Sequence, residues 1–560
     1  MMIISIIILY IVLISLSLSL VLSSLPFNNC NISLIEYNTL QDLYTSTNGP
    51  NWNTSCNENW IFSSNTSISI DYSAPCNNWF GIRCNSQCQV VQLSLQYCNL
   101  QGSISSSIRN LVQLTSIQLN NNKLSGSIPS SIGDLVNLLT VSISYNQLSS
   151  SITSSIGNLF NLVSVIISNN KLSGSIPSSV GNLTRLTYLD FSTNHLNGSI
   201  PSSIGNLVHI KSLIISYNHL SNSIPSSIGN LVNLTFLHFG YNHLNGSIPS
   251  TIGSLGKLNS IRITTNRLTG TIPSAIGSLL KLSNLRISSN EFTGTVPSSL
   301  KNLVHLTLFN VSCNHLTGTI PSWIDSLPSL TYLSLFNNHL TGTIPSSIGV
   351  LSNLTCLLIN DNKLTGVIQA NQICNMNRLQ VLFLHSNLFT DTVLSCLFSL
   401  PSIVGINLSN NHQLTGHLPS LVTTSSSRVL QYIILNNMNL FGSIPDSLFE
   451  LTSLKTLVLS SNCITGGLPK SVCTCNSIYN WSLILNGAFD ELQCPSNSHQ
   501  FSGSLPSCIF ASNISTLHLA GNRLVGQLPD IPTTSYIQDL NLASNIFTGI
   551  LITLHIFIIL

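Results

Sequence analysis

A unit of 24 residues recurs along most of this chain. The stretch 111–133 reads LVQLTSIQLNNNKLSGSIPSSIG, and closely similar stretches begin at Leu135 and Leu159. Their common pattern is LxxLxxLxLxxNxLxGxIPxxIG, where x is any residue. A chain of 560 residues that holds about 18–20 such units is expected to form one stacked array of repeats. The asparagine of the pattern recurs every 24 residues, at Asn122, Asn146, Asn170, Asn194, Asn218, Asn242, Asn266, Asn290, Asn314, Asn338 and Asn362.

Each part of the unit has its own physical role. The LxL segment alternates with period two, which predicts a short strand whose leucines face the core. The asparagine amide can donate to and accept from backbone groups, so we expect these asparagines to form a buried ladder between neighbouring units. Ile-Pro predicts an extended return segment, and the glycine predicts a tight turn. Two ladder positions differ: the thiol of Cys98 is expected to replace the amide in part, and Met438 predicts a weak point.

Stacking of these units predicts the fold class. One unit is too short to bury its own apolar residues, so neighbouring units must supply the packing. We predict an α/β solenoid that coils as a right-handed superhelix, a horseshoe with a parallel β-sheet on its concave face.

The LxGxIPxxIGxL half of the unit resembles the plant-type leucine-rich repeat, over about residues 35–550. That family includes the ectodomains of receptor-like kinases and receptor-like proteins, and the polygalacturonase-inhibiting proteins. The segments TLQDLYTSTNGPNW at 39–52 and CNNWFGIRC at 76–84 resemble its N-terminal cap. The resemblance implies that Cys76 and Cys84 form a disulfide and that Trp79 covers the end of the first repeat.

The pattern divides the chain into six segments. The first is apolar and predicts a signal peptide, with an uncleaved signal anchor as the alternative. The last is a short apolar tail, which is either the remnant of a lipid-anchor signal or an unfinished repeat. The segments are the signal peptide 1–24, the cap 25–88, the repeat array 89–469, an irregular cysteine-containing insertion 470–508, the terminal repeats 509–550 and the tail 551–560.

Cysteines and glycosylation motifs favour a secreted or cell-surface glycoprotein. The chain has 15 cysteines, concentrated at the two ends of the array, which is typical of disulfide-bonded caps. The cysteines of the insertion favour disulfides over a metal site. Twelve Asn-x-Ser/Thr sequons occur, and an exported chain can carry glycans there. They begin at Asn31, Asn53, Asn65, Asn182, Asn197, Asn233, Asn245, Asn310, Asn353, Asn407, Asn480 and Asn513.

Catalytic, cofactor and nucleic-acid sites are not expected. Charged residues make up 6% of the chain and the net charge is +2, which argues against phosphate-backbone binding. No nucleotide-binding, metalloprotease or serine-hydrolase motif occurs, and no metal or cofactor is predicted. A histidine column shares its position with lysine, arginine and glutamine, so we interpret it as a tolerant polar surface. Its members are His195, His219, His243, His315 and His339.

The exposed residues of the strands are the candidate ligand site. This face is expected to consist of the middle residue of LxL and the two residues after its second leucine. Charged and aromatic residues occur together only in the stretch 190–286, and tyrosine and arginine are frequent anchors of interfaces. The predicted site residues are Asp190, Tyr217, His238, Tyr241, Arg262 and Arg286.

These features predict an extracellular recognition module that binds a protein, peptide or glycan ligand, with a co-receptor as a further expected partner. Receptor-like signalling or defence is the expected role. The alternatives are a secreted inhibitor of a cell-wall-degrading enzyme, like the polygalacturonase-inhibiting proteins, and a matrix or adhesion protein. Contact with a membrane is expected only through a signal anchor or a lipid anchor.

Overall fold

The computed structural model describes residues 30–62, 71–420, 429–474, 481–487, 501–548 and 557–559. The chain forms two compact units, Met1–Leu196 (unit 1) and Asn197–Leu560 (unit 2). The predicted signal peptide lies outside the described residues. So do the sequons at Asn65 and Asn480, Cys475 and Cys494, and residues 551–556 of the tail.

Unit 1 begins with a helical cap that is tied to the first strand of the array. Helix α2 (Leu34–Ser46) starts with a capping box, in which the Ser33 hydroxyl accepts from the Glu36 amide at 3.2 Å. In return, Glu36 Oε2 accepts from the Ser33 amide at 3.3 Å. Glu36 Oε1 accepts from the Val90 amide at 3.0 Å, at the start of β2 (Val90–Ser94). The remaining elements of the cap are η1 (Gly49–Asn51), α3 (Thr54–Asn57), α4 (Ala74–Asn77) and β1 (Ile82–Cys84), and β1 pairs antiparallel with β2.

Three disulfides hold the cap together: Cys76–Cys84, Cys30–Cys88 and Cys56–Cys98. Trp79 is buried and stacks on Trp60, with ring centroids 4.7 Å apart. The interpretation of Cys98 as a free thiol in the asparagine ladder was wrong, because its sulfur is bonded to Cys56. At this position the backbone takes part in the ladder in place of the side chain, because the Cys98 amide donates to Asn122 Oδ1 at 2.9 Å.

After the cap, unit 1 is a parallel sheet whose strands follow one another in sequence order. Each strand holds a buried aliphatic residue between two exposed or half-buried ones, such as Val165 in β7. The strands after β2 are β4 (Ser116–Gln118), β6 (Thr140–Ser142), β7 (Ser164–Ile166) and β9 (Tyr188–Asp190).

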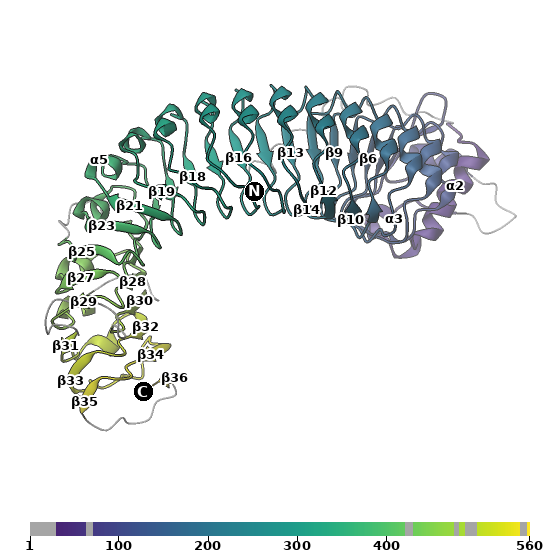
Figure 1. Cartoon of the computed structure of the whole chain (residues 1–560). Coiled ribbons are helices and arrows are strands. Elements are labelled where there is room, and N and C mark those ends of the chain that lie inside the picture. The colour runs from purple at the N-terminus through teal and green to yellow at the C-terminus, as the bar shows by residue number, and fades with distance from the viewer. Residues whose placement is uncertain are drawn as a thin grey trace. The chain divides into compact units, whose positions relative to one another are not determined.

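The long strands of unit 2 follow the same pattern, and each pairs in parallel and in register with its neighbour (Figure 1). Its strands are β11 (Ser212–Ile214), β13 (Phe236–His238), β15 (Ser260–Arg262), β16 (Asn284–Arg286), β17 (Leu308–Asn310), β18 (Tyr332–Ser334), β20 (Cys356–Leu358), β22 (Val381–Phe383), β24 (Gly405–Asn407), β26 (Tyr432–Ile434), β28 (Thr456–Val458), β30 (Trp481–Ile484), β32 (Ile514–His518), β34 (Asp539–Asn541) and β36 (Phe557–Ile559).

The return half of most repeats holds a short second strand and one turn of 3-10 helix. The Ile-Pro step leads into the 3-10 turn, as at Pro273, whose φ is −67°. The short strands are β3 (Gln101–Gly102), β5 (Lys123–Leu124), β8 (Ser173–Ser175), β10 (His195–Gly198), β12 (His219–Asn222), β14 (His243–Leu244), β19 (Thr341–Gly342), β21 (Lys363–Val367), β23 (Leu388–Thr392), β25 (Gln413–His417), β27 (Asn439–Gly442), β29 (Cys463–Ile464), β31 (Ser502–Gly503), β33 (Arg523–Gln527) and β35 (Ile546–Thr548).

The helical turns share one place in the repeat and cover the core on the side away from the long strands. In one repeat of unit 2 a four-residue α-helix, α5 (Ala370–Ile373), takes the place of the 3-10 turn. The 3-10 turns are η2 (Ser106–Asn110), η3 (Ser130–Asp134), η4 (Ser154–Asn158), η5 (Ser178–Asn182), η6 (Ser202–Asn206), η7 (Ser226–Asn230), η8 (Ser250–Ser254), η9 (Ser274–Ser278), η10 (Ser298–Asn302), η11 (Ser322–Ser326), η12 (Ser346–Val350), η13 (Ser395–Ser399), η15 (Asp446–Glu450), η16 (Lys470–Thr474) and η17 (Ile509–Ala511).

The ladder asparagines satisfy backbone groups of two adjacent repeats. At Asn290, Nδ2 donates to the carbonyls of Ile263 at 2.9 Å and Ile287 at 3.2 Å, and Oδ1 accepts from the Leu268 amide at 3.1 Å. The residue before each ladder asparagine has a positive φ, for example 58° at Tyr241. This turn position was not predicted from the sequence.

At Met438 a backbone hydrogen bond replaces the bond that a ladder asparagine accepts in other repeats. The methionine is fully buried, and the Leu414 amide, whose counterpart elsewhere donates to an asparagine, donates to the Asn411 carbonyl at 3.0 Å. The backbone donor therefore has a partner, and the weak point expected at this repeat remains a prediction.

The segment 470–508, predicted as an irregular insertion, contains the strand half of a repeat. Strand β30 pairs in register with β28 and continues to β32. Trp481, fully buried, stands where other repeats have an aliphatic residue, and this substitution hid the strand in the sequence. In the tail, β36 pairs in parallel with β34.

Unit 2 contains further disulfides, and Cys463 in β29 is one of its bonded cysteines. Cys473 bonds to Cys508, and Cys374 at the end of α5 bonds to Cys396 in η13. The second bond lies within the array, where no disulfide was expected. Cys313 and Cys356 are free thiols.

Candidate functional site

The outward side chains of the long strands form the candidate binding surface, which we call the strand face. In unit 2 the strand face holds a row of basic residues. His238, Arg262 and Arg286 end β13, β15 and β16 and are register partners of one another. Because hydrogen-bonded strands lie about 4.8 Å apart, these side chains share one small area of the surface.

Arg262 is held by an aromatic ring and not by a carboxylate. Its guanidinium carbon lies over the Phe236 ring, 5.2 Å from the centroid, which is a cation–π geometry. Arg262 Nε is buried and has no hydrogen-bond partner in the described part of the chain. Arg286 Nε donates to Asn284 Oδ1 at 3.2 Å. Neither arginine forms an ion pair with a described residue, so both positive charges are available to a ligand.

His238 lies beside the two arginines as a neutral side chain. Its Nδ1 is 3.3 Å from the Ser216 hydroxyl, and its ring meets Phe236 edge to face. Burial, and then the charges of Arg262 and Arg286, lower the pKa of His238 to about 4. At neutral and mildly acidic pH, the imidazole therefore offers hydrogen bonds without adding charge.

Two tyrosines border this row at the turn after the strands. Tyr217 and Tyr241 stack face to face, with centroids 4.2 Å apart and ring planes 8° apart. They are 48% and 43% exposed, so the stack presents a flat aromatic surface to solvent. Burial and the neighbouring Tyr241 raise the pKa of Tyr217.

Gly240 lies close to Thr264 of the neighbouring repeat and to His238. A Cβ at this position would lie 2.9 Å from Thr264 Oγ1 and 3.4 Å from His238 Nε2. Most other repeats carry a side chain here, as at Ser216 and Thr264. The glycine therefore allows the backbone to approach Thr264 at a place where a side chain would be crowded.

Asp190, the remaining predicted site residue, belongs to unit 1, at the end of β9. Its Oδ1 accepts from the Ser192 amide at 2.9 Å and from the Ser192 hydroxyl at 2.6 Å. Burial raises the pKa of Asp190, and the hydrogen bonds from Ser192 oppose that rise. The structure thus brings five of the six predicted residues together within unit 2, as the basic row and the tyrosine stack.

Phe236 belongs to the site and was missed from the sequence. The predicted strand face comprised only the middle residue of LxL and the two residues after its second leucine. Phe236 precedes His238 by two residues, and the period-two alternation of a strand puts both side chains on one face. That alternation was the available signal.

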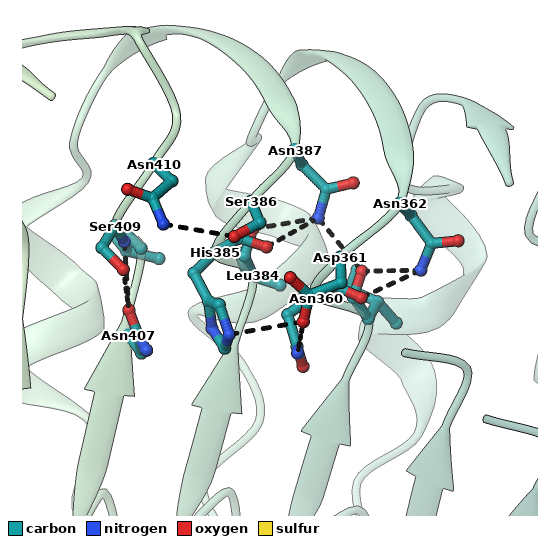
Figure 2. Close-up of polar contacts among 12 residues, drawn as sticks. Asn360, Asp361, Asn362, Leu384, His385, Ser386, Asn387, Asn407, Ser409 and Asn410 are labelled. Carbon is teal, nitrogen blue, oxygen red and sulfur yellow. Dashed lines mark hydrogen bonds and ion pairs between the residues drawn. The ribbon is translucent and has the colours of Figure 1, made fainter. Parts of the chain in front are cut away.

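A second polar cluster lies farther along the strand face of unit 2 (Figure 2). His385 Nε2 is 3.6 Å from Asp361 Oδ2, and Asn360 Nδ2 donates to the same oxygen at 2.6 Å. Burial lowers the pKa of His385, and the Asp361 carboxylate opposes this. Here, in contrast to the arginine row, the charged group already has partners within the chain.

No group of three or more His, Cys, Asp or Glu side chains among the described residues could hold a metal ion. None of the helices formed by these residues is both long enough and apolar enough to cross a bilayer.

Comparison with known proteins agrees with this architecture. Residues 189–316 match the family described as Leucine-rich repeat region, and 113–135, 161–183, 329–351 and 453–475 match Leucine Rich Repeat. Receptor-like protein 35 of Arabidopsis thaliana is 34% identical over 153 residues, which span 27% of this chain and 15% of that protein. The match therefore covers a small part of this much longer relative.

Solved structures resemble the chain over most of its length. The Arabidopsis receptor kinase HAESA, in complex with the peptide hormone IDA and the co-receptor SERK1, aligns with a TM-score of 0.72 and 30% identity, over 92% of this chain and 86% of that one. The plant peptide hormone receptor RGFR1 in complex with RGF2 aligns with a TM-score of 0.67 and 28% identity, over 84% and 95% of the two chains. The chain belongs to the plant-type leucine-rich-repeat proteins, the family of receptor-like proteins and receptor-kinase ectodomains.

Proposed function

We propose that this chain is an extracellular recognition module of a receptor-like protein, and that it binds a peptide through an acidic group of that peptide. The observation that carries the proposal is the row of Arg262 and Arg286. Two half-buried guanidinium groups lie on neighbouring strands and have no carboxylate partner among the described residues. A carboxylate or another anionic group of a ligand would pair with both.

The surroundings of the arginines suit a peptide. The neutral His238 offers a hydrogen-bonding group, and the stack of Tyr217 on Tyr241 offers aromatic contact. Receptors solved with peptide hormones align with most of this chain, which supports a peptide ligand and a co-receptor as partners. The likeness is to binding proteins, which favours recognition over catalysis.

Matched synthetic peptides test the proposal. A library of short peptides is prepared in pairs, with each acidic residue present in one member and replaced by its amide in the other. Binding to the secreted full chain is measured for both members. We expect selected peptides to bind in the acidic form and to lose most of their affinity in the amide form. Equal affinity within every selected pair would overturn the proposal.

A further inference from the structure

Two asparagines that begin Asn-x-Ser sequons lie inside long strands of unit 2. Asn310 ends β17, and Asn407 ends β24. The residues on either side of Asn310, Phe309 and Val311, are fully buried, so the Asn310 side chain stands on the strand face. The other sequons within the described part of the chain lie outside the long strands, at Asn31, Asn53, Asn182, Asn197, Asn233, Asn245, Asn353 and Asn513.

Both asparagines are oriented by the serine of their own sequon. Asn310 Oδ1 accepts from the Ser312 amide at 3.0 Å and from the Ser312 hydroxyl at 2.7 Å. Asn407 Oδ1 accepts from the Ser409 amide at 3.1 Å and from its hydroxyl at 2.7 Å. Neither Nδ2 donates a hydrogen bond to a described residue, and Figure 2 shows the Asn407 nitrogen on the side away from Ser409.

We propose that Asn310 and Asn407 carry N-linked glycans that stand on the strand face. In this modification an oligosaccharide is transferred from a lipid diphosphate carrier. A bond forms between Nδ2 and the anomeric carbon of the first sugar, the bond from that carbon to the diphosphate breaks, and Nδ2 loses one proton. The oxygen that fixes each side chain is not the atom that is modified, so the fold keeps its serine contacts. The proposal rests on the extracellular location proposed above.

The two glycans divide the strand face of unit 2. Asn310 is the register partner of Arg286, and Asn407 is the register partner of Phe383. Strands β18, β20 and β22 lie between the two glycans, across four strand spacings of about 4.8 Å each. Because glycans are bulky and polar, they would shield the half-buried Leu358 and Phe383 on that stretch.

The basic row keeps one open side. A glycan on Asn310 borders Arg286 on the C-terminal side, whereas β13, β15 and β16 carry no sequon. A ligand that reaches Arg262 and Arg286 would therefore lie toward β13 and would not extend across β17. The glycans thus assign the ligand to one part of an otherwise continuous sheet.

Glycopeptide mapping of the full chain, secreted from eukaryotic cells, tests the sites. Enzymatic deglycosylation in heavy-oxygen water converts each occupied asparagine to labelled aspartate, which mass spectrometry locates. We expect label at Asn310 and Asn407, and at Asn182, which lies off the strand face in η5. Label at Asn182 with none at Asn310 and Asn407 would overturn the proposed glycans on the strand face but would leave the extracellular location standing. Absence of label from every sequon would contradict the extracellular location as well.

Hydroxyl-radical footprinting tests the shielding. In Asn407→Gln the sequon is lost, and we expect oxidation of Phe383 to rise several-fold while oxidation of Tyr241 is unchanged. Ser409→Thr, which keeps the sequon, is the matched control and should leave Phe383 protected. Equal oxidation of Phe383 in the wild type and in Asn407→Gln would contradict the shielding.

Discussion

Arg262 and Arg286 are register partners on β15 and β16, so two positive charges lie about one strand spacing apart on the same face. Burial and then the charge of Arg286 lower the pKa of Arg262. The same two arginines help to lower the pKa of His238. No described carboxylate relieves this repulsion, and an acidic group of a ligand would do so.

The Phe236 ring is predicted to support ligand binding through Arg262. Phe236→Leu keeps an apolar side chain but removes the ring from beneath the guanidinium group. Cation–π contacts contribute about 0.5–2 kcal/mol, so the Kd for an acidic peptide should rise roughly 2- to 30-fold. Phe236→Tyr keeps the ring and should bind like the wild type. Indistinguishable Kd values for the two variants, measured by calorimetry, would exclude this role.

His238 is predicted to make folding stability depend on pH. Its pKa is about 4 in the folded chain, against an ordinary value of 6.5. Below pH 6.5, His238 binds a proton in the unfolded chain but stays neutral in the folded chain. Folding stability is therefore lost as the pH falls from 6.5 to about 4. His238→Gln removes this loss, which is at most about 3 kcal/mol. Urea midpoints of the two proteins should diverge in favour of the variant over that range, and a constant difference would refute the prediction.

The asparagine ladder is predicted to be a large source of stability. Asn290→Ala leaves the buried Leu268 amide and the Ile263 carbonyl without their partner. We expect a loss of about 2–4 kcal/mol, seen as a lower midpoint of chemical denaturation. Asn302→Ala replaces an exposed asparagine of η10 and should change the midpoint little. Similar effects of the two substitutions would argue against the ladder.

The Cys374–Cys396 disulfide is predicted to stabilise the middle of the array. It closes a segment with a sequence separation of 22 residues. Replacement of both cysteines by alanine should cost about 2–4 kcal/mol, because the unfolded chain gains freedom. The double substitution of the free Cys313 and Cys356 by alanine is the matched control. Thermal unfolding that is the same for both double variants would contradict the prediction.

The strict spacing of the ladder asparagines explains why the fold could be predicted. Each asparagine marks the same turn, so the core leucines and the outward positions follow by counting. Where the spacing of the asparagines is irregular, the positions of the strands could not be counted from it. Strand β30 escaped detection because Trp481 replaces an aliphatic residue after a repeat of unusual length.

Contacts between repeats were harder to predict than positions within one repeat. Cys374 and Cys396 occupy the helical turns of consecutive repeats, and their separation of nearly one period was the available signal. The stacking of Arg262 on Phe236 joins neighbouring strands and depends on side-chain rotamers that no sequence pattern records. A repeat pattern states which residues are outward, but not which of them touch.

Calorimetry with an acidic peptide selected from the matched library tests the central claim most directly. The peptide is titrated into the wild type, into Arg262→Glu with Arg286→Glu, and into Lys257→Glu with Lys281→Glu, which makes the same charge change at exposed positions outside the strands. We predict a loss of about 2–5 kcal/mol of binding free energy in the arginine variant and little change in the lysine variant. Unchanged affinity in a folded arginine variant, or equal losses in both variants, would contradict the assignment of the ligand to this row.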